Sequence, residues 1–250
     1  MQKHRNTPLE KPAFNAESCS TDSRLNILHD LPFFKNLPDA AIVEINAIFR
    51  TRHYQSGEVI YFNGDPASRL CVVAAGGVKL LKHNNDGHDV LIDILKQGEF
   101  FGTLDILGGT LYQETAEAQT NCCILKISSG QFRTILNTYP LAAINIIDIL
   151  SDRLKSAYEM MKQLSVQSVE QRIAFTLLKL ARKVGSQKNV GLLIDLPLSR
   201  SDLAAMTGTT SETASRIMSQ FQKQGIIKTG RQWVSITEPD KLEKLLESDL

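Results

Sequence analysis

The apolar positions of residues 199–225 fall at the spacing of two short helices. They form one apolar face on each side of Gly208: Leu203, Ala204, Met206, Ala214, Ile217, Met218 and Phe221. Ser199, with Asp202 three residues later, predicts a capped helix start, Thr210 is placed to cap the second helix, and Gly225 to end it. Two short helices joined by a tight turn predict a helix-turn-helix.

Residues 226–236 follow these helices as two short β-rich runs. They predict a hairpin that turns at Thr229 and Gly230. A hairpin directly after the second helix makes the predicted unit a winged helix-turn-helix.

A different pattern covers residues 54–127. Short apolar alternations are separated by glycine turns at Gly57, Gly64, Gly76, Gly98 and Gly108. Turns about every eight to twelve residues, with β-rich segments between them, are typical of a sandwich or jelly roll.

The segment from about Pro140 to Leu164 predicts one long helix that is apolar on two flanks. One flank holds Ile144, Ile147, Leu150, Leu154, Met161 and Leu164, and the other holds Ile146, Ile149, Ala157 and Tyr158. Such a helix needs two neighbours, so we expect one flank to pack on the roll and the other on a second copy of the chain. The predicted dimer interface is Ile147, Leu150, Leu154, Tyr158 and Met161.

The remaining segments complete an α+β chain. Residues 24–50 and 169–183 carry helical spacing, residues 185–189 predict a polar loop, and residues 1–22 predict a mobile arm. The expected division is a sensor roll over residues 23–139, a dimerisation helix over 140–166 and a winged helix-turn-helix domain over 167–250.

The charge is unevenly distributed along a chain of net charge +1. Residues 165–237 hold ten Lys and Arg against four Asp and Glu, a net charge of +6, while residues 238–250 hold two against five, a net charge of −3. A basic module with an acidic tail is the local footprint expected of a DNA-binding domain. No apolar run has the length of a membrane span, and the start lacks the apolar core of a signal peptide, so we expect a cytoplasmic protein.

The outward positions of the second short helix carry the candidate base contacts. Arg216 can pair with guanine, Glu212 can accept from cytosine, and Ser215 lies beside them. The candidate backbone contacts are Ser199, Arg200, Ser201, Thr210, Ser211, Lys228 and Arg231. The alternative is a solvated helix face on which Glu212 and Arg216 form a pair four residues apart.

The run from Gly208 to Arg216 resembles the recognition helix of the CRP/FNR family of bacterial transcription regulators. It is similar to the FNR branch, which uses Glu, Ser and Arg where this chain has Glu212, Ser215 and Arg216. The glycine pattern of the roll and the segment from Arg153 to Ala174 also resemble this family, so the resemblance spans roughly residues 32–237. It implies a homodimer that binds TTGAT-like half-sites in double-stranded DNA.

The resemblance also places an effector pocket at Gly102, Thr103, Leu104 and Tyr112 of the roll and at Ala157 and Tyr158 of the dimerisation helix. Family members that bind cyclic AMP have a Glu where this chain has Thr103, and an Arg about eleven residues later that holds the phosphate. No Lys or Arg occurs from Gln97 to Leu125. A buried phosphodiester without a cation is costly, so we expect an apolar, uncharged pocket that does not bind cyclic AMP.

Other cofactors of the family are also considered. An iron–sulfur cluster needs four cysteine thiolates, and neighbouring Cys122 and Cys123 would point to opposite faces of a strand, which argues against one. No metal ligand set is predicted. A haem that senses nitric oxide or carbon monoxide stays open, with His29, His53, His83 and His88 as candidate ligands.

The sequence thus predicts a transcription regulator and no enzyme. We expect its roll to couple an effector, redox or gas signal to DNA binding, with RNA polymerase as a further partner. A ligand-binding module without functional DNA binding is the alternative from another class. A cupin-like metalloenzyme is disfavoured, because clustered His and carboxylates are absent from the sequence.

Overall fold

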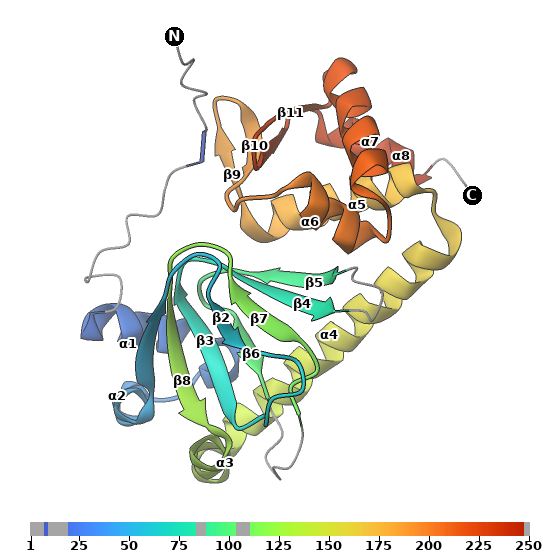
Figure 1. Cartoon of the computed structure of the whole chain (residues 1–250). Coiled ribbons are helices and arrows are strands. Elements are labelled where there is room, and N and C mark those ends of the chain that lie inside the picture. Colours follow the sequence, from blue (N-terminus) through green and yellow to red (C-terminus); the bar gives the residue numbers. More distant parts are fainter. Residues whose placement is uncertain (1–7, 10–19, 84–88, 104–110, 248–250) are drawn as a thin grey trace. The chain divides into compact units, whose positions relative to one another are not determined.

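The structure, a computed structural model, describes residues 8–9, 20–83, 89–103 and 111–247 (Figure 1). The chain divides into two compact units, one of residues 12–158 and a second that includes residues 159–250. Most of the predicted arm, residues 1–7 and 10–19, lies outside the described residues. The last two residues of the predicted arm, Thr21 and Asp22, instead belong to helix α1 (Thr21–Asp30), which the hydroxyl of Ser20 caps.

The first unit is built on two four-stranded antiparallel sheets, so the predicted roll is confirmed. One sheet has the order β1-β8-β3-β6, from β1 (Arg50–Tyr54), β8 (Cys122–Ser128), β3 (Arg69–Ala75) and β6 (Phe100–Gly102). The other has the order β2-β7-β4-β5, from β2 (Val59–Tyr61), β7 (Thr115–Ala118), β4 (Val78–His83) and β5 (Asp89–Leu95).

Strand β8 shows why this unit has two cores. Its side chains alternate, so Cys122 and Ile124 join a cluster between the two sheets, while Cys123, Leu125 and Ile127 join a second cluster under the helices. Because both faces are buried, the strand is apolar along most of its length, with Lys126 as the buried exception.

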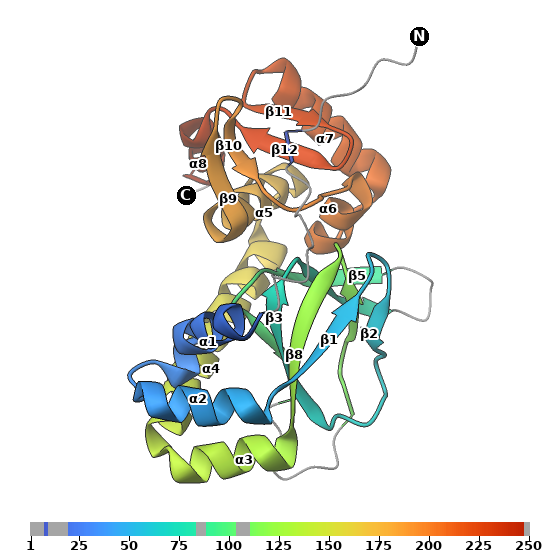
Figure 2. The same ribbon diagram turned by 90° about the vertical axis from the view of Figure 1, so that its left-hand side faces the viewer.

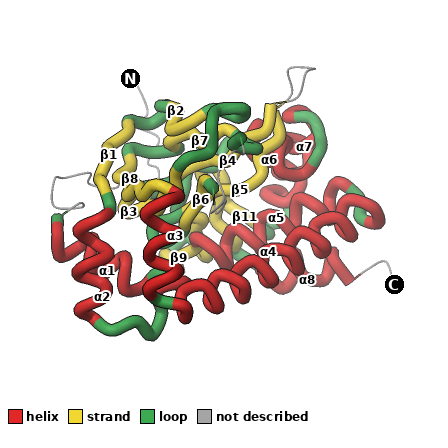
Figure 3. The backbone as a smooth tube through the Cα atoms, turned by 90° about the horizontal axis from the view of Figure 1, so that it is seen from below, coloured by secondary structure: helices red, strands yellow, loops and turns green. Residues whose placement is uncertain are grey.

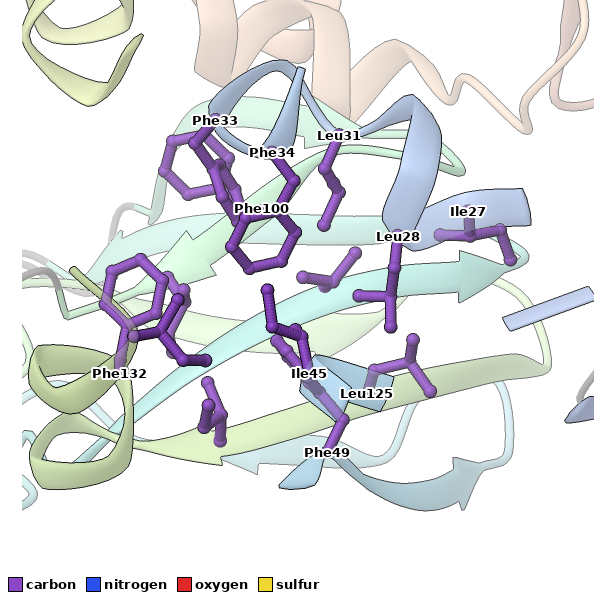
Figure 4. Packing of buried hydrophobic residues seen from close by; sticks show 14 of the residues in the cluster. Ile27, Leu28, Leu31, Phe33, Phe34, Ile45, Phe49, Phe100, Leu125 and Phe132 are labelled. Atoms are coloured by element: carbon purple, nitrogen blue, oxygen red, sulfur yellow. The ribbon is translucent and has the colours of Figure 1, made fainter. Parts of the chain in front are cut away.

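Helices cover the outer face of the first sheet (Figure 2). They are α1, the short 3-10 helix η2 (Pro32–Phe34), α2 (Asp39–Ile48) and α3 (Ser129–Thr138). The ring of Phe33 lies edge-on to Phe34, Phe100 and Phe132, with centroids 4.5, 5.1 and 5.8 Å away, and these rings fill the centre of the cluster (Figure 4). Edge-to-face contacts of this kind stabilise an aromatic core beyond the area that it buries.

Helix α4 (Pro140–Val166) is continuous, as predicted (Figure 3). Its buried flank consists of Ala142, Ile146 and the partly buried Ile149, all packed in the cluster under the helices. The predicted packing of one flank on the roll therefore holds for Ile146 and Ile149 but not for Ala157 and Tyr158, which are exposed. On the other flank Ile144, Ile147, Leu150, Leu154 and Met161 are exposed, and the side chain of Leu164 lies outside the described residues.

The second unit contains the predicted helix-turn-helix and wing. Its elements are α5 (Val169–Val184), β9 (Gly185–Lys188), β10 (Gly191–Ile194), α6 (Arg200–Thr207), α7 (Ser211–Lys223), β11 (Ile227–Gly230), β12 (Trp233–Ile236) and α8 (Pro239–Glu247). The strands form one antiparallel sheet in the order β11-β12-β10-β9.

Two local predictions for this unit are wrong. Residues 185–188, predicted as loop, form β9, because they pair along β10, which supplies buried Leu193 and Ile194. The wing turns at Arg231 and Gln232, two residues later than predicted, and Gln232 takes a left-handed φ of 61°. The acidic tail also contains a helix that was not predicted, α8, which packs on α5 through buried Leu242.

Among the described helices, none is by itself long and apolar enough to cross a bilayer. The pair Ser129–Thr138 and Pro140–Glu159, bent by 113°, meets the length and composition criterion only when the two are taken together.

Candidate nucleic-acid interface and the interior of the roll

The helix-turn-helix is fixed by its caps. The Ser199 hydroxyl accepts from the Asp202 amide, and the Asp202 carboxylate accepts from the Ser199 amide at 2.9 Å, so the predicted capping box starts α6. Gly208 ends α6 with a left-handed φ of 60°, which a residue with a side chain rarely adopts. The hydroxyl of Thr210 then accepts from the Thr213 amide and starts α7. These three local features set the angle between the two helices.

Helix α7 buries one face and exposes the other. Ala214, Ile217, Met218 and Phe221 are buried, whereas Glu212 and Arg216 are exposed and Ser215 is half-buried. The Glu212 carboxylate and the Arg216 guanidinium form no ion pair with each other, although they are four residues apart. The two side chains expected to contact bases therefore do not form the Glu212–Arg216 ion pair that a merely solvated helix face would require.

The candidate backbone contacts lie in different environments. Lys228 and Arg231 are exposed on the wing, and Ser201 and Ser211 are exposed with their hydroxyl oxygens 3.5 Å apart. The hydroxyl of Ser199 is engaged in the cap of α6, where it also donates to the Asp202 carboxylate at 2.7 Å. Arg200 is half-buried, and its guanidinium Nη2 donates to the hydroxyl of Thr229 at 2.9 Å.

Arg172 in α5 is a residue of this unit that the sequence reasoning missed. Its Nε donates to the Thr207 carbonyl at 2.9 Å, and its Nη1 donates to the Gln167 carbonyl at 3.0 Å. One guanidinium thus ties the segment that follows α4 to the end of α6. The sequence carries no signal of this, because both acceptors are main-chain carbonyls.

The space between the two sheets of the roll is packed with aromatic side chains. The rings of Tyr61 and Tyr112 stack with centroids 3.7 Å apart, and Phe101 lies 6.0 Å from Tyr61. The Tyr61 hydroxyl donates to Glu114 Oε1 at 2.9 Å. Burial, with the charge of Glu114 beside it, raises the pKa of Tyr61, so this phenol stays protonated.

Three of the six predicted effector-pocket residues meet around the main chain of Arg69. The Thr103 amide donates to the Arg69 carbonyl at 3.1 Å, and the Tyr112 hydroxyl bonds both the amide and the carbonyl of Arg69 at 3.2 Å. Gly102 pairs with Leu70 across the sheet. Leu104 lies outside the described residues, and Ala157 and Tyr158 are exposed on α4.

The interior of the roll holds a charged side chain, although Lys126 is not one of the predicted pocket residues. Lys126 is only 8% exposed, and its amine donates to the Tyr54 hydroxyl and lies 4.9 Å from the Tyr54 ring centroid. Burial, above all other causes, lowers the pKa of Lys126, and Arg52 and Arg69 lower it further. Lys126 lies one residue beyond the stretch from Gln97 to Leu125 that lacks Lys and Arg.

A second cation reaches the roll from α4. The Arg153 guanidinium lies 4.1 Å over the Phe100 ring centroid, and its Nη2 donates to the Phe100 carbonyl at 3.0 Å. Burial lowers the pKa of Arg153, and the carboxylates of Asp93, Glu99 and Glu114 act in the opposite direction. Arg153 therefore fastens α4 to the start of β6, two residues before Gly102.

The described cysteine and histidine side chains are poorly suited to ligate a cofactor. Cys122 and Cys123 join opposite clusters, as predicted, and burial raises the pKa of the Cys71 and Cys122 thiols to about 12, so both stay protonated. His29 and His53 are exposed, while His88 and the side chain of His83 lie outside the described residues. Within the described part of the chain, no group of three or more His, Cys, Asp or Glu could hold a metal ion.

The second flank of α4 is a row of exposed apolar side chains. Ile147, Tyr158 and Met161 are 65%, 60% and 63% exposed, and Leu150 and Leu154 lie between them on the same flank. Their spacing of three and four residues matches the seam of two helices that pack along each other.

This fold and its exposed helix define a class of protein: a DNA-binding module of the winged helix-turn-helix type joined through a long helix to a roll of the cyclic-nucleotide-binding type. Family models agree, because residues 51–139 match the cyclic nucleotide-binding domain and residues 171–245 match the Crp-like helix-turn-helix domain. The chain belongs to the CRP/FNR family of transcription regulators. It is accordingly a DNA-binding regulator and not an enzyme.

Individual relatives cover nearly the whole chain. The cyclic AMP receptor protein of Thermus thermophilus is 28% identical over 214 residues, which are 86% of this chain and 96% of that protein. Electron transport regulator A of Shewanella oneidensis is 25% identical over 243 residues, which are 97% of this chain and 94% of that protein. Among solved structures, FixK2 from Bradyrhizobium japonicum is 25% identical with a TM-score of 0.71, covering 79% of this chain and 97% of that one.

Proposed function

We propose that this regulator works as a homodimer that reads TTGAT-like inverted repeats, with its roll passing a signal to the DNA-binding module. In this proposal Arg216 pairs with the guanine of each half-site, Glu212 accepts from the cytosine opposite, and Ser215 lies between them. Ser199, Arg200, Ser201, Thr210, Ser211, Lys228 and Arg231 surround them as the backbone-contacting set. RNA polymerase is the proposed protein partner.

The exposed amino end of α7 carries this proposal. Glu212 and Arg216 stand in solvent without pairing with each other, and Thr210 caps the helix directly before them. A long cation and an acceptor at the start of a helix are what bidentate contacts in a major groove require. The exposed Lys228 and Arg231 on the wing add positive charge for phosphates.

The dimer is supported by the exposed flank of α4. Exposing Ile147, Leu150, Leu154, Tyr158 and Met161 together to water is unfavourable, and a second copy of the same helix would bury all five. A two-fold dimer presents two α7 helices, which explains why the target would be an inverted repeat. The proposed division is a roll over residues 23–139, a dimer helix over 140–166 and a DNA-binding domain over 167–250.

The signal proposed for the roll is not cyclic AMP. The side chains of Tyr61, Phe101 and Tyr112 pack between the sheets, and the Glu114 carboxylate would repel a cyclic phosphate. A redox or gas signal is proposed instead. Haem is the alternative carrier, although the two histidines with described side chains, His29 and His53, are exposed rather than directed between the sheets.

The test is an anisotropy titration of the purified protein on labelled duplexes. One duplex carries two TTGAT half-sites one helical turn apart, and a matched duplex carries a different base at the guanine of each half-site. Binding at least tenfold tighter to the first duplex is the expected result. Equal affinity for both would refute the readout, and no binding to either would favour a ligand-binding module. A visible spectrum with added haem tests the alternative carrier.

A further inference from the structure

Arg200 connects two parts of the DNA-binding module that are far apart in the sequence. It is the first residue of α6, and its guanidinium Nη2 donates to the hydroxyl of Thr229 in β11 at 2.9 Å. The same hydroxyl donates to the Trp233 carbonyl in β12 at 3.0 Å. The Thr229 hydroxyl thus accepts one hydrogen bond and donates another, and it joins α6 to both strands of the wing.

A main-chain bond makes a second link at the same place. The Leu198 amide, directly before α6, donates to the Gln232 carbonyl at the wing turn at 3.0 Å. The wing is therefore held to the start of α6 at its strands and at its tip. Because Lys228 and Arg231 lie on either side of Thr229, these links determine where the two wing cations stand relative to α7.

The environment of Arg200 differs from that of an exposed side chain that could contact a DNA phosphate. It is half-buried, and burial lowers the pKa of its guanidinium without any charged neighbour contributing to the shift. Lys228 and Arg231, in contrast, are exposed. A guanidinium withdrawn from water in this way is expected to be held by neutral hydrogen bonds, and the Thr229 hydroxyl supplies one.

We propose that Arg200 is a positioning residue for the wing: its hydrogen bond to Thr229 sets the wing so that Lys228 and Arg231 reach the phosphates. This inference rests on the proposed function, since it assigns a role within DNA binding. For Arg200 alone, it replaces the direct phosphate contact given under the proposed function, because it requires Thr229 to matter as much as the arginine does.

The wing contains a natural fluorescent probe. Trp233 is the single tryptophan of the chain, so its fluorescence reports on the wing alone. Its ring packs against Gly230, where a Cβ would lie 2.3 Å from the indole nitrogen. A wing released from α6 should therefore change the emission of Trp233 and expose it to a soluble quencher such as acrylamide.

The first experiment uses the full-length protein without DNA. Arg200→Ala and Thr229→Val should both shift the Trp233 emission to longer wavelength and increase quenching by acrylamide. Arg182→Ala is the matched control, because it also removes one positive charge from this module but from an exposed pair with Glu243. Trp233 emission should stay unchanged in that control. Circular dichroism should show that all three variants keep their helices.

The second experiment measures affinity for the two-half-site duplex against salt concentration. Arg200→Ala and Thr229→Val should each weaken binding about tenfold and flatten the salt dependence, although the valine variant removes no charge. The double variant should be no weaker than Arg200→Ala alone, because both changes break one link.

Unchanged Trp233 fluorescence in both variants, or a valine variant that binds like wild type, would overturn the inference and leave Arg200 as a phosphate contact. If the wild-type protein bound no duplex, the proposed function would fail, while the fluorescence result would still decide whether Arg200 holds the wing.

Discussion

In α7 the residues expected to touch DNA stand in solvent, whereas between the sheets of the roll the residues expected to touch an effector are engaged with the protein itself. Glu212 and Arg216 are exposed, while Tyr112 is buried, stacks on Tyr61 and bonds the main chain of Arg69. Both regions match family models. The difference shows that one chain can expose the side chains expected at one site while those expected at another make contacts inside the protein.

The largest effect in this comparison should come from separating the two copies of the DNA-binding module. Ile147→Asp with Leu154→Asp places charges in the proposed seam and should give a monomer. Loss of one half-site contact should lower DNA affinity by at least about a hundredfold, since a single module holds one half-site weakly. Sedimentation velocity gives the assembly state and anisotropy gives the affinity.

Val43→Asp is the matched control, because Val43 is similarly exposed, at 56%, but lies on α2 away from the seam. It should leave the protein dimeric. A double aspartate variant that still sedimented as a dimer would place the interface elsewhere.

The next effect concerns readout by α7. Arg216→Ala should cost about 1–3 kcal/mol on the matched site and remove the preference for guanine at one position. Lys228→Ala should instead weaken all sequences alike and flatten the salt dependence. Competition binding across half-sites varied at that base separates the two results. An equal loss for every base would make Arg216 a phosphate contact.

A smaller effect should come from the buried amine of the roll. The pKa of Lys126 is lower in the folded protein than in the unfolded chain, so the unfolded chain keeps the lysine proton to higher pH. The free energy of unfolding should therefore rise with pH between the folded pKa of Lys126 and the ordinary lysine pKa of about 10.4. Lys126→Met should abolish that rise and, by removing the desolvated charge, stabilise the fold at pH 7 by about 1 kcal/mol. Urea unfolding at pH 7 and pH 10 measures both.

Lys35→Met, which changes an exposed lysine of the same unit, should leave the pH dependence intact. Destabilisation of Lys126→Met at both pH values would mean that the bond to the Tyr54 hydroxyl outweighs the cost of burying the amine.

The smallest effect should be that of cyclic AMP. At millimolar concentration it should change neither the melting temperature nor the affinity for DNA, since a ligand that binds neither state shifts no equilibrium. A rise of several degrees would show that Lys126 or Arg153 can turn toward the phosphate after all. Scanning fluorimetry with cyclic GMP and AMP as controls gives the comparison.

The sequence by itself determined the elements of this protein wherever local chemistry decides the structure. The helix-turn-helix followed from the cap at Ser199, the break at Gly208 and the apolar face of α7, because helix caps and amphipathic spacing act within a few residues. The long helix, the two-sheet roll and the opposite directions of Cys122 and Cys123 followed from periodicity in the same way.

Only the tertiary structure decided what fills the roll and what holds the wing. Three hydrogen bonds join residues that are far apart in the sequence: Lys126 to Tyr54, 72 residues apart, Arg200 to Thr229, 29 apart, and Arg172 to the Thr207 carbonyl, 35 apart. Polar Gly185–Lys188 became a strand because β10 was there to pair with it. Such contacts depend on which side chains and carbonyls the fold brings together in space, and no spacing along the chain encodes them.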